Sequence, residues 1–590
     1  MKKLIIEGKH ELSGTIKIGG AKNSVVALIP AAMLTDGKCV IYNVPDISDV
    51  HRLIEMMEKL GSSIKFEGDT LYIDNSNSKN AVIDEEYASK LRASYYFMGV
   101  LLAKYGHAEI SYPGGCSIGS RPINFHLNGF EKLGANVKIK DNKEYIVDAN
   151  ELKGNDIFLD FASVGATLNI MFAAVKAKGV THIYNAAKEP EIVNVASFLG
   201  TMGAKVYGAG TSQITIEGVD TLGDGIVEVI PDRIEAGTYI MIGSLLGKNL
   251  VIEGVIKEHL ESVLTKLMEA GCDIKIDGTT IIVNKVDKLK PVNVKTLVYP
   301  GFPTDLGQPM STLLTQCEGE SLFEETIYEN RMRHIKYLNA MGANIKLFDK
   351  SAIIFGKSDL LGRDVEATDL RAGAAMMVAG MIAEGTTKIV NIEHILRGYE
   401  NIAEKFNNLK IIASDVNNNA LESARRNVSK YKLEDRIDIR LGSGVSVINK
   451  KDKIDTLVVA GMGANTIIGF LKYSQDKLKD INKIIIQSNT DLFFLRKNMV
   501  SMGYYIDDED LVLDKNIIYT VIMFKKGKKK YSYKELYLGP ILLDKNSELF
   551  TKKCDKELKT ITMILNNIGS GHYLYKLKLK RNIKILKNIT

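Results

Sequence analysis

The sequence predicts an α/β protein in which one helix-and-strand unit occurs six times and is followed by a different, Rossmann-like sheet. A glycine follows an apolar helical segment six times, at intervals of 66 to 73 residues. A second glycine closes the next, amphipathic segment in five of these copies. After residue 409 this spacing stops, and short apolar strands alternate with helical segments. Repeats of this length are long enough to close compact α/β modules.

Each copy consists of an apolar helix, a glycine, a short strand, an amphipathic helix and a further strand. The glycines after the apolar helices are Gly37, Gly106, Gly179, Gly247, Gly319 and Gly385. Those after the amphipathic helices are Gly61, Gly134, Gly203, Gly271 and Gly342. Glycine readily adopts the left-handed conformation in which many helices end. The strands that follow, such as 64–66 and 137–139, alternate apolar and polar residues, so we expect helices to cover one face of each small sheet.

The carboxyl-terminal segment has its own pattern of strands and helices. The expected elements are a strand at 410–415, a helix at 418–430 and strands at 437–441, 456–459 and 483–487. Alternating strands and helices with glycines at strand ends predict a parallel, Rossmann-like sheet. We therefore expect two domains, residues 1–409 and 410–590.

The composition is that of a globular protein, with 45% hydrophobic and 25% charged residues among 590. Charged residues interrupt the first seven positions, which argues against a secretory signal, and the apolar runs near 94–103 and 372–383 are too short to span a membrane. We expect a cytoplasmic protein with no membrane contact. Five cysteines without a CxxC pair or a His-Cys cluster argue against disulfides and zinc, and no metal is expected.

The two predicted domains differ in charge. Residues 1–409 carry 43 Lys+Arg and 51 Asp+Glu, a net charge of −8, whereas residues 410–590 carry 34 and 20, a net charge of +14. Basic residues interleave with tyrosines or apolar residues at 525–533 and 573–587. This pattern suits RNA through phosphate contacts and base stacking. It equally suits a solvated turn and an amphipathic helix.

A glycine-rich loop, Tyr112-Pro-Gly-Gly-Cys-Ser-Ile-Gly-Ser-Arg-Pro122, contains a single cysteine. Glycines let a ligand approach the main chain closely, and the guanidinium of Arg121 suits carboxylate or phosphate groups. An accessible thiol near positive charge is suited to acid, base or nucleophile chemistry. Cys116 is therefore a candidate catalytic residue, and the alternative is a free cysteine in a turn.

Seven separate motifs in residues 1–409 together resemble the UDP-N-acetylglucosamine 1-carboxyvinyltransferase family. They are Gly19-Gly-Ala-Lys-Asn23, Leu91-Arg-Ala-Ser94, Pro113-Gly-Gly-Cys-Ser-Ile-Gly-Ser-Arg-Pro122, Phe302-Pro-Thr-Asp305, Glu329-Asn-Arg331, Asp369-Leu-Arg371 and Arg397-Gly-Tyr-Glu400. The resemblance implies the enolpyruvyl transferase fold, a two-lobed inside-out α/β barrel of six repeats, with one lobe at 22–229 and the other at 1–21 with 230–409. It also implies the reaction that opens peptidoglycan synthesis, transfer of the enolpyruvyl group of phosphoenolpyruvate to the 3-hydroxyl of UDP-N-acetylglucosamine.

The resemblance also implies roles for residues of these motifs. Cys116 would protonate C3 of phosphoenolpyruvate, Asp305 would accept the proton of the sugar hydroxyl, and Asp369 would belong to the catalytic set. The cations that would clamp phosphoenolpyruvate are Lys22, Arg92, Arg121, Arg371 and Arg397. The UDP-sugar would contact Asn23, Arg121, Pro122, Ile123, Asn124, Phe125, Asp305 and Ile327. The alternative for Asp305, from its position after Pro-Thr, is the cap of a helix that begins at Leu306.

Residues 410–590 resemble the bacterial tRNA (adenine-N1)-methyltransferase family, which uses S-adenosylmethionine. The resemblance rests on Asp415, Ala460-Gly-Met-Gly463, Ser488-Asn489, Tyr531-Ser-Tyr-Lys-Glu-Leu536 and Leu538-Gly-Pro540. Asp415 would match the acid that binds the cofactor ribose. A glycine-rich loop should precede such an acid by about 20 residues, but residues 393–399 there belong to the preceding motif, so the first strand and its loop are missing. We therefore expect no cofactor, no binding of S-adenosylmethionine and only a vestigial Asp415, with tRNA an open partner.

Two other functions compete with this interpretation. The shikimate-pathway enolpyruvyl transferase shares the six-repeat fold and the chemistry, but the cysteine loop argues against it. A bifunctional protein that also methylates tRNA adenine N1, or an RNA-binding protein with a passenger synthase, is the other candidate. Methylation would need the cofactor loop that the sequence lacks.

Overall fold

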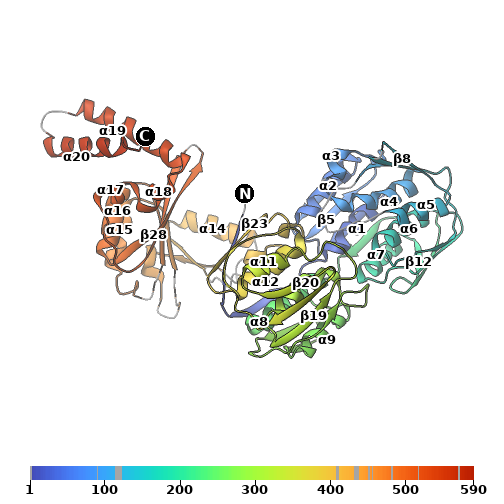
Figure 1. The fold of residues 1–590 in the computed structure, drawn as a ribbon. Helices are drawn as coiled ribbons and strands as arrows, with labels where there is room; N and C mark the ends of the chain where they lie inside the picture. The colour runs from blue at the N-terminus through green and yellow to red at the C-terminus, as the bar shows by residue number, and fades with distance from the viewer. Residues whose placement is uncertain are drawn as a thin grey trace. The chain divides into compact units, whose positions relative to one another are not determined.

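The structure, a computed structural model, shows two compact units, Met1–Asn408 and Leu409–Thr590 (Figure 1). It describes residues 3–89, 91–112, 123–141, 143–406, 411–430, 437–449, 452, 454, 456–479, 481, 483–515, 517–568 and 572–589. Within these ranges, no helix is both long enough and apolar enough to cross a bilayer.

Three sheets of the first unit, all formed within residues 38–228, share one topology. In strand order they are β14 (Gly225–Glu228), β3 (Lys38–Tyr42), β5 (Thr70–Asp74) and β4 (Ser63–Glu67); β6 (Val82–Ile83), β7 (His107–Ser111), β9 (Glu144–Asp148) and β8 (Asn136–Lys140); and β10 (Asp156–Phe158), β11 (Val180–Tyr184), β13 (Gln213–Glu217) and β12 (Lys205–Tyr207). The first two strands of each order are parallel and the other pairs are antiparallel. The predicted repeat is therefore visible as one sheet per copy.

Three further sheets complete the six copies. They are β2 (Leu12–Lys17), β15 (Gly247–Glu253), β17 (Thr280–Asn284) and β16 (Asp273–Asp277); β18 (Val294–Lys295), β19 (Gly319–Glu324), β21 (Ser351–Gly356) and β20 (Asn344–Phe348); and β22 (Asp364–Glu366), β23 (Thr386–Val390) and β1 (Leu4–Glu7). Each again starts with a parallel pair. The sixth sheet has three strands among the described residues, and it belongs to the copy in which the sequence pattern stops.

The predicted glycine stops form as expected. Gly61, Gly134, Gly203, Gly271 and Gly342, which close the amphipathic helices, all have φ between 88° and 110°. These helices, in chain order, are α2 (Ser48–Lys59), α5 (Asn124–Lys132), α7 (Pro190–Thr201), α9 (Glu261–Glu269), α11 (Ile335–Ala340) and, without such a stop, α13 (Ile402–Phe406). A side chain at these angles is strained, so the glycines fix where each helix turns into its next strand.

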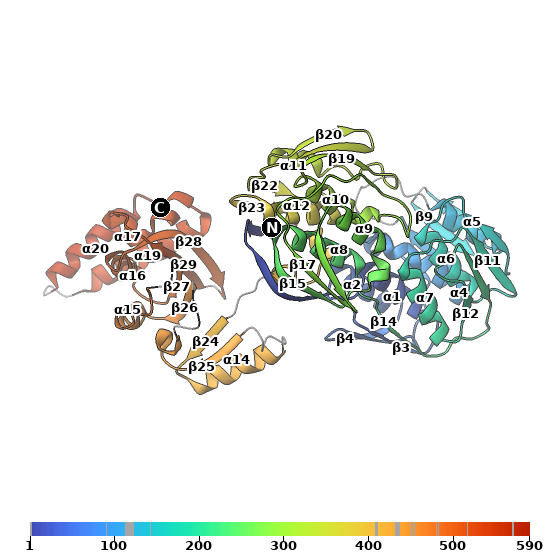
Figure 2. The same ribbon diagram turned by 90° about the horizontal axis from the view of Figure 1, so that it is seen from below.

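Six apolar helices occupy the centre of the unit. They are α1 (Lys22–Ala32), α4 (Tyr96–Tyr105), α6 (Val164–Ala174), α8 (Arg233–Leu246), α10 (Thr304–Leu314) and α12 (Leu370–Ile382). All 14 residues of α8 are buried. Because such helices offer no face to water, the sheets lie outside them and bury alternate residues, as in β3. Figure 2 shows β15 and β17 beside α8, the inside-out arrangement that the sequence predicts.

The buried residues of this unit form two cores, which we call the first and second lobes. The first lobe's core joins residues 21–229. The core of the second lobe joins Leu12, Ile16 and Ile18 of the amino-terminal segment to residues 234–402. The chain therefore starts in the second lobe, builds the first lobe and then returns. Both crossings lie at one place, where the Ala21 N–H donates to the Ile230 carbonyl.

The second unit contains a short sheet and a longer one. The short sheet pairs β24 (Ile411–Asp415) with β25 (Ile437–Leu441) in parallel, connected by α14 (Asn418–Lys430). The longer sheet has the order β26 (Thr456–Met462), β27 (Lys483–Ser488), β29 (Ile517–Lys526) and β28 (Tyr504–Asp514). The strands predicted for one parallel sheet thus occur in two sheets (Figure 2), and only β26 and β27 of the longer one are parallel. No pairing among the described strands connects β24 or β25 with β26, which fits the prediction that the first strand of this sheet is missing.

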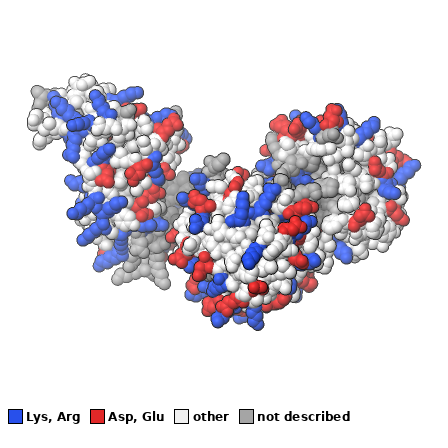
Figure 3. All heavy atoms as spheres, viewed as in Figure 1, with Lys and Arg blue, Asp and Glu red and all other residues white. Residues whose placement is uncertain are grey.

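Helices cover the longer sheet and form the carboxyl-terminal end. They are α15 (Ala464–Tyr473), α16 (Leu492–Ser501), α17 (Tyr533–Leu538), α18 (Pro540–Lys545), α19 (Glu548–Asn567) and α20 (Tyr573–Leu586). The basic segment at 573–587 is thus mainly a helix, one of the two forms that the sequence left open. Figure 3 shows many Lys and Arg side chains on the visible face of this unit, which agrees with its net charge.

A buried ion pair joins the sheet of the second unit to its helices. Arg496 on α16 lies 2.7 Å from Glu509 on β28, and neither side chain is exposed. The Arg496 guanidinium also donates to the carbonyls of Leu536 and Tyr537. At Gly539, φ is +101° and an added Cβ would lie 2.5 Å from a Glu509 carboxylate oxygen. This glycine therefore lets α17 and α18 close over the ion pair.

Replacing Glu509 by Ala should destabilise the second unit by about 3–5 kcal/mol, because removal of one partner leaves a buried charge uncompensated. Hydrogen exchange on the full chain should show lost protection in α16 and β28, and unchanged protection in the first unit. Glu548→Ala is the control, since Glu548 is 90% exposed and its ion pair is on the surface. Equal protection in Glu509→Ala and Glu548→Ala would contradict a structural role for the buried pair.

Candidate active site

All six central helices of the first unit begin at one cavity of about 630 Å³. Their first residues are Lys22, Tyr96, Val164, Arg233, Thr304 and Leu370, and each lines the cavity. The first turn of a helix has unpaired N–H groups and carries partial positive charge. Six such ends around one cavity make it a site for anions.

The Asp49 carboxylate joins two cations of this cavity. Asp49, in the first turn of α2, is 1% exposed and lies 3.0 Å from Lys22 Nζ. Arg397, in the short helix η3 (Ile395–Arg397), donates to it from Nε at 2.9 Å and from Nη2 at 3.3 Å. Burial opposes ionisation, but Lys22 and Arg397 outweigh it and hold the pKa of Asp49 below its usual value. Because Lys22 and Asp49 belong to the first lobe and Arg397 to the second, this cluster joins the lobes.

A second carboxylate, that of Asp305, is held by two guanidinium groups. Arg371 Nη2 lies 2.8 Å from one Asp305 oxygen, and Arg331 is bonded to the other. Asn23 of the first lobe donates to the same group at 3.4 Å. Burial raises the pKa of Asp305, but Arg371 and Arg331 outweigh it and hold the pKa far below its usual value. The alternative of a helix cap is wrong, because α10 begins at Thr304, its cap position is Pro303 and Asp305 makes no capping bond.

Asp369 presents an acceptor oxygen at the same cavity. One oxygen caps α12 by accepting from the N–H groups of Arg371 and Ala372, at 2.9 and 3.0 Å. The other, Oδ2, is buried and has no hydrogen-bond partner among the described residues. A buried acceptor without a partner is costly. A donor on a bound ligand would satisfy it.

The structure brings most of the predicted site residues together. Those that line the cavity are Lys22, Asn23, Arg92, Phe125, Asp305, Ile327, Asp369, Arg371 and Arg397. Ile123 and Asn124 are not among the lining residues. Ile123 is buried just before α5, and Asn124 is exposed at the first position of that helix. Cys116, Arg121 and Pro122 lie outside the described residues. Asp415 is exposed at the end of β24 in the second unit, where its carboxylate accepts from the Asn417 N–H.

The sequence interpretation missed several lining residues that carry charge. They are Asp49, Glu189, Glu191 and Arg233. Asp49 and Glu191 each occupy the first turn of an amphipathic helix, where an acidic residue is common because it favours the helix dipole. The position of a residue within the repeat could have indicated them, because the central helix of every copy begins at the cavity.

Two carboxylates reduce the repulsion between the cations of the cavity. Lys22 and Arg397 share Asp49, and Arg371 and Arg331 share Asp305. Burial lowers the pKa of Lys22, as do Arg397 and Arg371, while Asp49 raises it. The two aspartates therefore neutralise part of the positive charge before any ligand binds.

Replacing Asp49 by Asn should destabilise the first unit by about 3–5 kcal/mol, because Lys22 and Arg397 lose their shared counter-charge. Calorimetric melting of the full chain would measure this. Millimolar inorganic phosphate should raise the melting temperature of the variant more than that of the wild type, because an anion can replace the lost carboxylate. Asp364→Asn is the control, since Asp364 is 79% exposed. An equal response of wild type and Asp49→Asn to phosphate would contradict the role given to Asp49.

Comparison with known proteins finds sequence relatives of both units. The family model of EPSP synthase (3-phosphoshikimate 1-carboxyvinyltransferase) matches residues 6–406, and that of tRNA (adenine(22)-N(1))-methyltransferase matches residues 401–588. The UDP-N-acetylglucosamine 1-carboxyvinyltransferase 2 of Listeria monocytogenes serovar 1/2a is 49% identical over 414 residues, which are 70% of this chain and 97% of that protein. The UDP-N-acetylglucosamine 1-carboxyvinyltransferase of Halothermothrix orenii is 51% identical over 409 residues, which are 69% of this chain and 98% of that protein.

Solved structures agree on the fold of the first unit. The enolpyruvyl transferase NikO from Streptomyces tendae matches with a TM-score of 0.63 and 24% identity, over 69% of this chain and 97% of that one. EPSP synthase from Acinetobacter baumannii matches with a TM-score of 0.53 and 17% identity, over 67% of this chain and 96% of that one. Since the family model covers more than half of the residues and the curated relatives are matched almost from end to end, the chain belongs to the EPSP synthase family of enolpyruvyl transferases.

Proposed function

We propose that the first unit transfers the enolpyruvyl group of phosphoenolpyruvate to the 3-hydroxyl of UDP-N-acetylglucosamine and releases phosphate, the activity for which its relatives are named. One observation carries the proposal: the Asp305 carboxylate lies in the same cavity as the cations Lys22 and Arg397. A base can accept the proton of the attacking hydroxyl, and neighbouring cations can bind the anionic enol phosphate that it attacks. The curated relatives support the choice of acceptor.

The chemistry divides into an addition and an elimination. In the addition, the sugar oxygen bonds to C2 of phosphoenolpyruvate, the hydroxyl proton passes to a base, and C3 gains a proton. In the elimination, C3 loses a proton and the C2–O bond to phosphate breaks, which restores the double bond. Lys22, Arg371 and Arg397 would stabilise the phosphate and carboxylate groups throughout.

Asp305 suits the role of base in the addition. The carboxylate is unprotonated at neutral pH, as a proton acceptor must be, and its oxygens already face Asn23 and Arg371. Its low pKa makes it a weak base, so the proton is transferred as the sugar oxygen bonds to C2, which makes the proton on that oxygen strongly acidic. Asp369 offers a second acceptor oxygen, which is free of partners among the described residues. Cys116, in the predicted loop outside the described residues, is the proposed acid for C3. Arg121, Pro122, Ile123 and Asn124 are proposed to hold the nucleotide beside Phe125.

Wild-type protein should release phosphate from phosphoenolpyruvate only when UDP-N-acetylglucosamine is added, and shikimate 3-phosphate should not replace that acceptor. Cys116→Ala should lose most turnover, because no other thiol lies in the glycine-rich loop. Cys116→Asp should retain part of it, because a carboxylic acid also delivers a proton. Cys272→Ala, in the core of the second lobe, is the control. Normal turnover by Cys116→Ala would remove the acid role, and turnover with shikimate 3-phosphate would favour the competing function.

For the second unit we propose no binding of S-adenosylmethionine and no methyl transfer. The residues that should form the cofactor loop, 393–399, belong to the first unit, where Arg397 donates to Asp49, and α13 follows them in the same unit. There, Ile402 lies in the core of the second lobe, Lys405 donates to Glu235 at 2.6 Å, and the Phe406 ring lies 4.8 Å from that of Tyr239. Because one backbone segment cannot take both positions, the cofactor loop has no chain to form it.

Calorimetric titration of the full chain with S-adenosylmethionine should give no binding heat, and transfer RNA should gain no methyl group from it. A chain that ends at Asn408 should keep the transferase activity, because both lobe cores lie within residues 12–402. Clear binding or methylation would instead favour the bifunctional alternative and would mean that another segment supplies the loop.

A further inference from the structure

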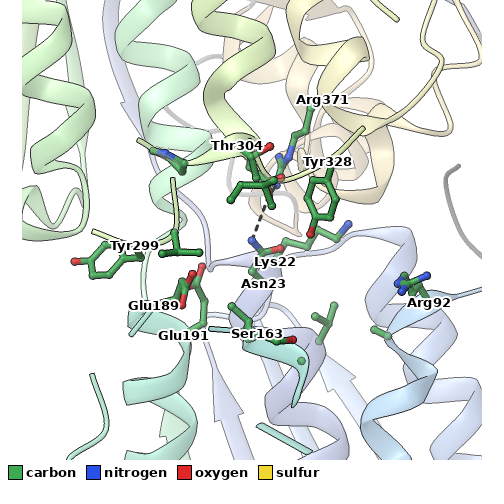
Figure 4. Close-up of a pocket in the computed structure, with 18 of the residues that line it drawn as sticks. Lys22, Asn23, Arg92, Ser163, Glu189, Glu191, Tyr299, Thr304, Tyr328 and Arg371 are labelled. Atoms are coloured by element: carbon green, nitrogen blue, oxygen red, sulfur yellow. Dashed lines mark hydrogen bonds and ion pairs between the residues drawn. The ribbon is translucent and has the colours of Figure 1, made fainter. Parts of the chain in front are cut away.

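The cavity has an anion-binding side and an acidic side. In Figure 4, Arg92 lies on one side of Lys22, whereas Glu189, Glu191 and Tyr299 lie together on the other. All of these residues line the cavity. The nucleoside diphosphate part of an acceptor is anionic and would be repelled by two carboxyl groups. The acidic side must therefore receive a different part of the ligand.

The acidic side contains buried polar atoms for which the described part of the chain provides no hydrogen-bond partner. Glu191 on α7 and Arg233 on α8 are 3% and 8% exposed, and Arg233 Nη2 lies 3.3 Å from Glu191 Oε1. The second oxygen of Glu191, Oε2, has no hydrogen-bond partner among the described residues, and neither has Nε of Arg233. Buried polar groups are almost always hydrogen-bonded, and leaving one unpaired costs free energy. An acceptor and a donor are thus both available to a ligand.

Glu189 adds a group that can both donate and accept. Burial and, after it, the neighbouring charge of Glu191 raise its pKa to about 7, although Arg233 opposes the shift. Near neutral pH a fraction of Glu189 is therefore a carboxylic acid, which has one donor and free acceptor sites. The Arg233 guanidinium also lies 5.5 Å from the centre of the Tyr299 ring, so its position is fixed from two sides.

Hydroxyl groups of a sugar fit this set of donors and acceptors. A hydroxyl is neutral, so two carboxyl groups do not repel it, and it donates one hydrogen bond while it accepts others. Arg233 and Asp305 line the same cavity and attract each other electrostatically, so the acidic side is close to the base proposed for the 3-hydroxyl. In a pyranose, the 4-hydroxyl is on the carbon next to the one that bears the 3-hydroxyl, and C6, which bears the 6-hydroxyl, is attached to the following carbon, C5. The 4- and 6-hydroxyls therefore lie along the same edge of the sugar.

We propose that Glu189, Glu191 and Arg233 form the subsite that binds the 4- and 6-hydroxyls of the acceptor sugar and distinguishes the configuration at C4. The diphosphate then points to the opposite side, toward Arg92. This inference rests on the proposed function for the choice of a UDP-sugar as ligand. It adds the residues that select the sugar.

Calorimetric titration of the full chain with three ligands would test the subsite. The ligands are UDP-N-acetylglucosamine, its 4-epimer UDP-N-acetylgalactosamine, and UDP, which lacks the sugar. Wild type should prefer the first over the second. Glu191→Gln and Glu189→Ala should each weaken binding of UDP-N-acetylglucosamine by about tenfold, the effect of one lost hydrogen bond. Both should reduce the preference over the epimer and leave the affinity for UDP unchanged.

Glu217→Gln is the matched control, because Glu217 forms an exposed ion pair with Lys205 on the surface of the first lobe. It should bind all three ligands as the wild type does. UDP also reports on folding, so a variant that still binds UDP has a folded cavity. If Glu191→Gln proves unstable, Glu189→Ala carries the test, since Glu189 is not part of the ion pair with Arg233.

The outcomes separate this inference from the proposed function. If the wild type releases phosphate with UDP-N-acetylglucosamine but the variants keep its preference over the epimer, the subsite is wrong and the function stands. If the wild type discriminates the epimers and the variants do not, yet no phosphate is released, the subsite stands and the transfer reaction is wrong. Equal losses for UDP and for both UDP-sugars would also overturn the subsite, because they would show general damage to the cavity.

Discussion

The convergence of six helix starts on one cavity is the constraint on which the rest of the first unit depends. Each lobe packs three apolar helices with no exposed face, so the sheets have to lie outside them. The same packing concentrates positive partial charge at the cavity. Basic side chains at those helix starts, such as Lys22 and Arg371, add full charges to the partial ones. The buried Asp49 and the partly buried Asp305 compensate this field in the unliganded protein.

These aspartates have different neighbours, and this difference separates their roles. Asp49 joins a cation from each lobe, so its charge influences how the lobes meet. Asp305 is held within the second lobe by Arg371 and Arg331, and among the described residues the first lobe contributes one hydrogen bond to it, from the Asn23 amide at 3.4 Å. A carboxylate held by rigid groups keeps its orientation while a substrate enters. One aspartate thus joins the two lobes, and the other presents a base in a fixed position.

Much of this architecture could be predicted from the sequence, because glycine spacing and apolar periodicity are local signals. The stops at Gly61 and Gly342 and the membership of the family are confirmed. Asp49 and Glu191 could not be found in this way, because a first-turn acid has an ordinary local explanation and its partners are far away in the sequence. The absence of a first strand in the second unit was predicted, but the resulting division into two sheets was not, because the sequence pattern of a strand shows which residues are buried but not which strands are its neighbours. The helix cap considered for Asp305 failed because two distant guanidinium groups bind the carboxylate more strongly than backbone amides do.

The placement of β1 and β2 has a consequence for synthesis on the ribosome. The first-lobe core is drawn from residues 21–229, so it can close while the rest of the chain is still being made. The partners of β2 and β1 are β15 and β23, which are translated far later. Until then the two amino-terminal strands have unpaired edges, and exposed edges invite association with other chains. The order of translation therefore makes the second lobe the last part of the first unit to fold and the part most exposed to association with other chains.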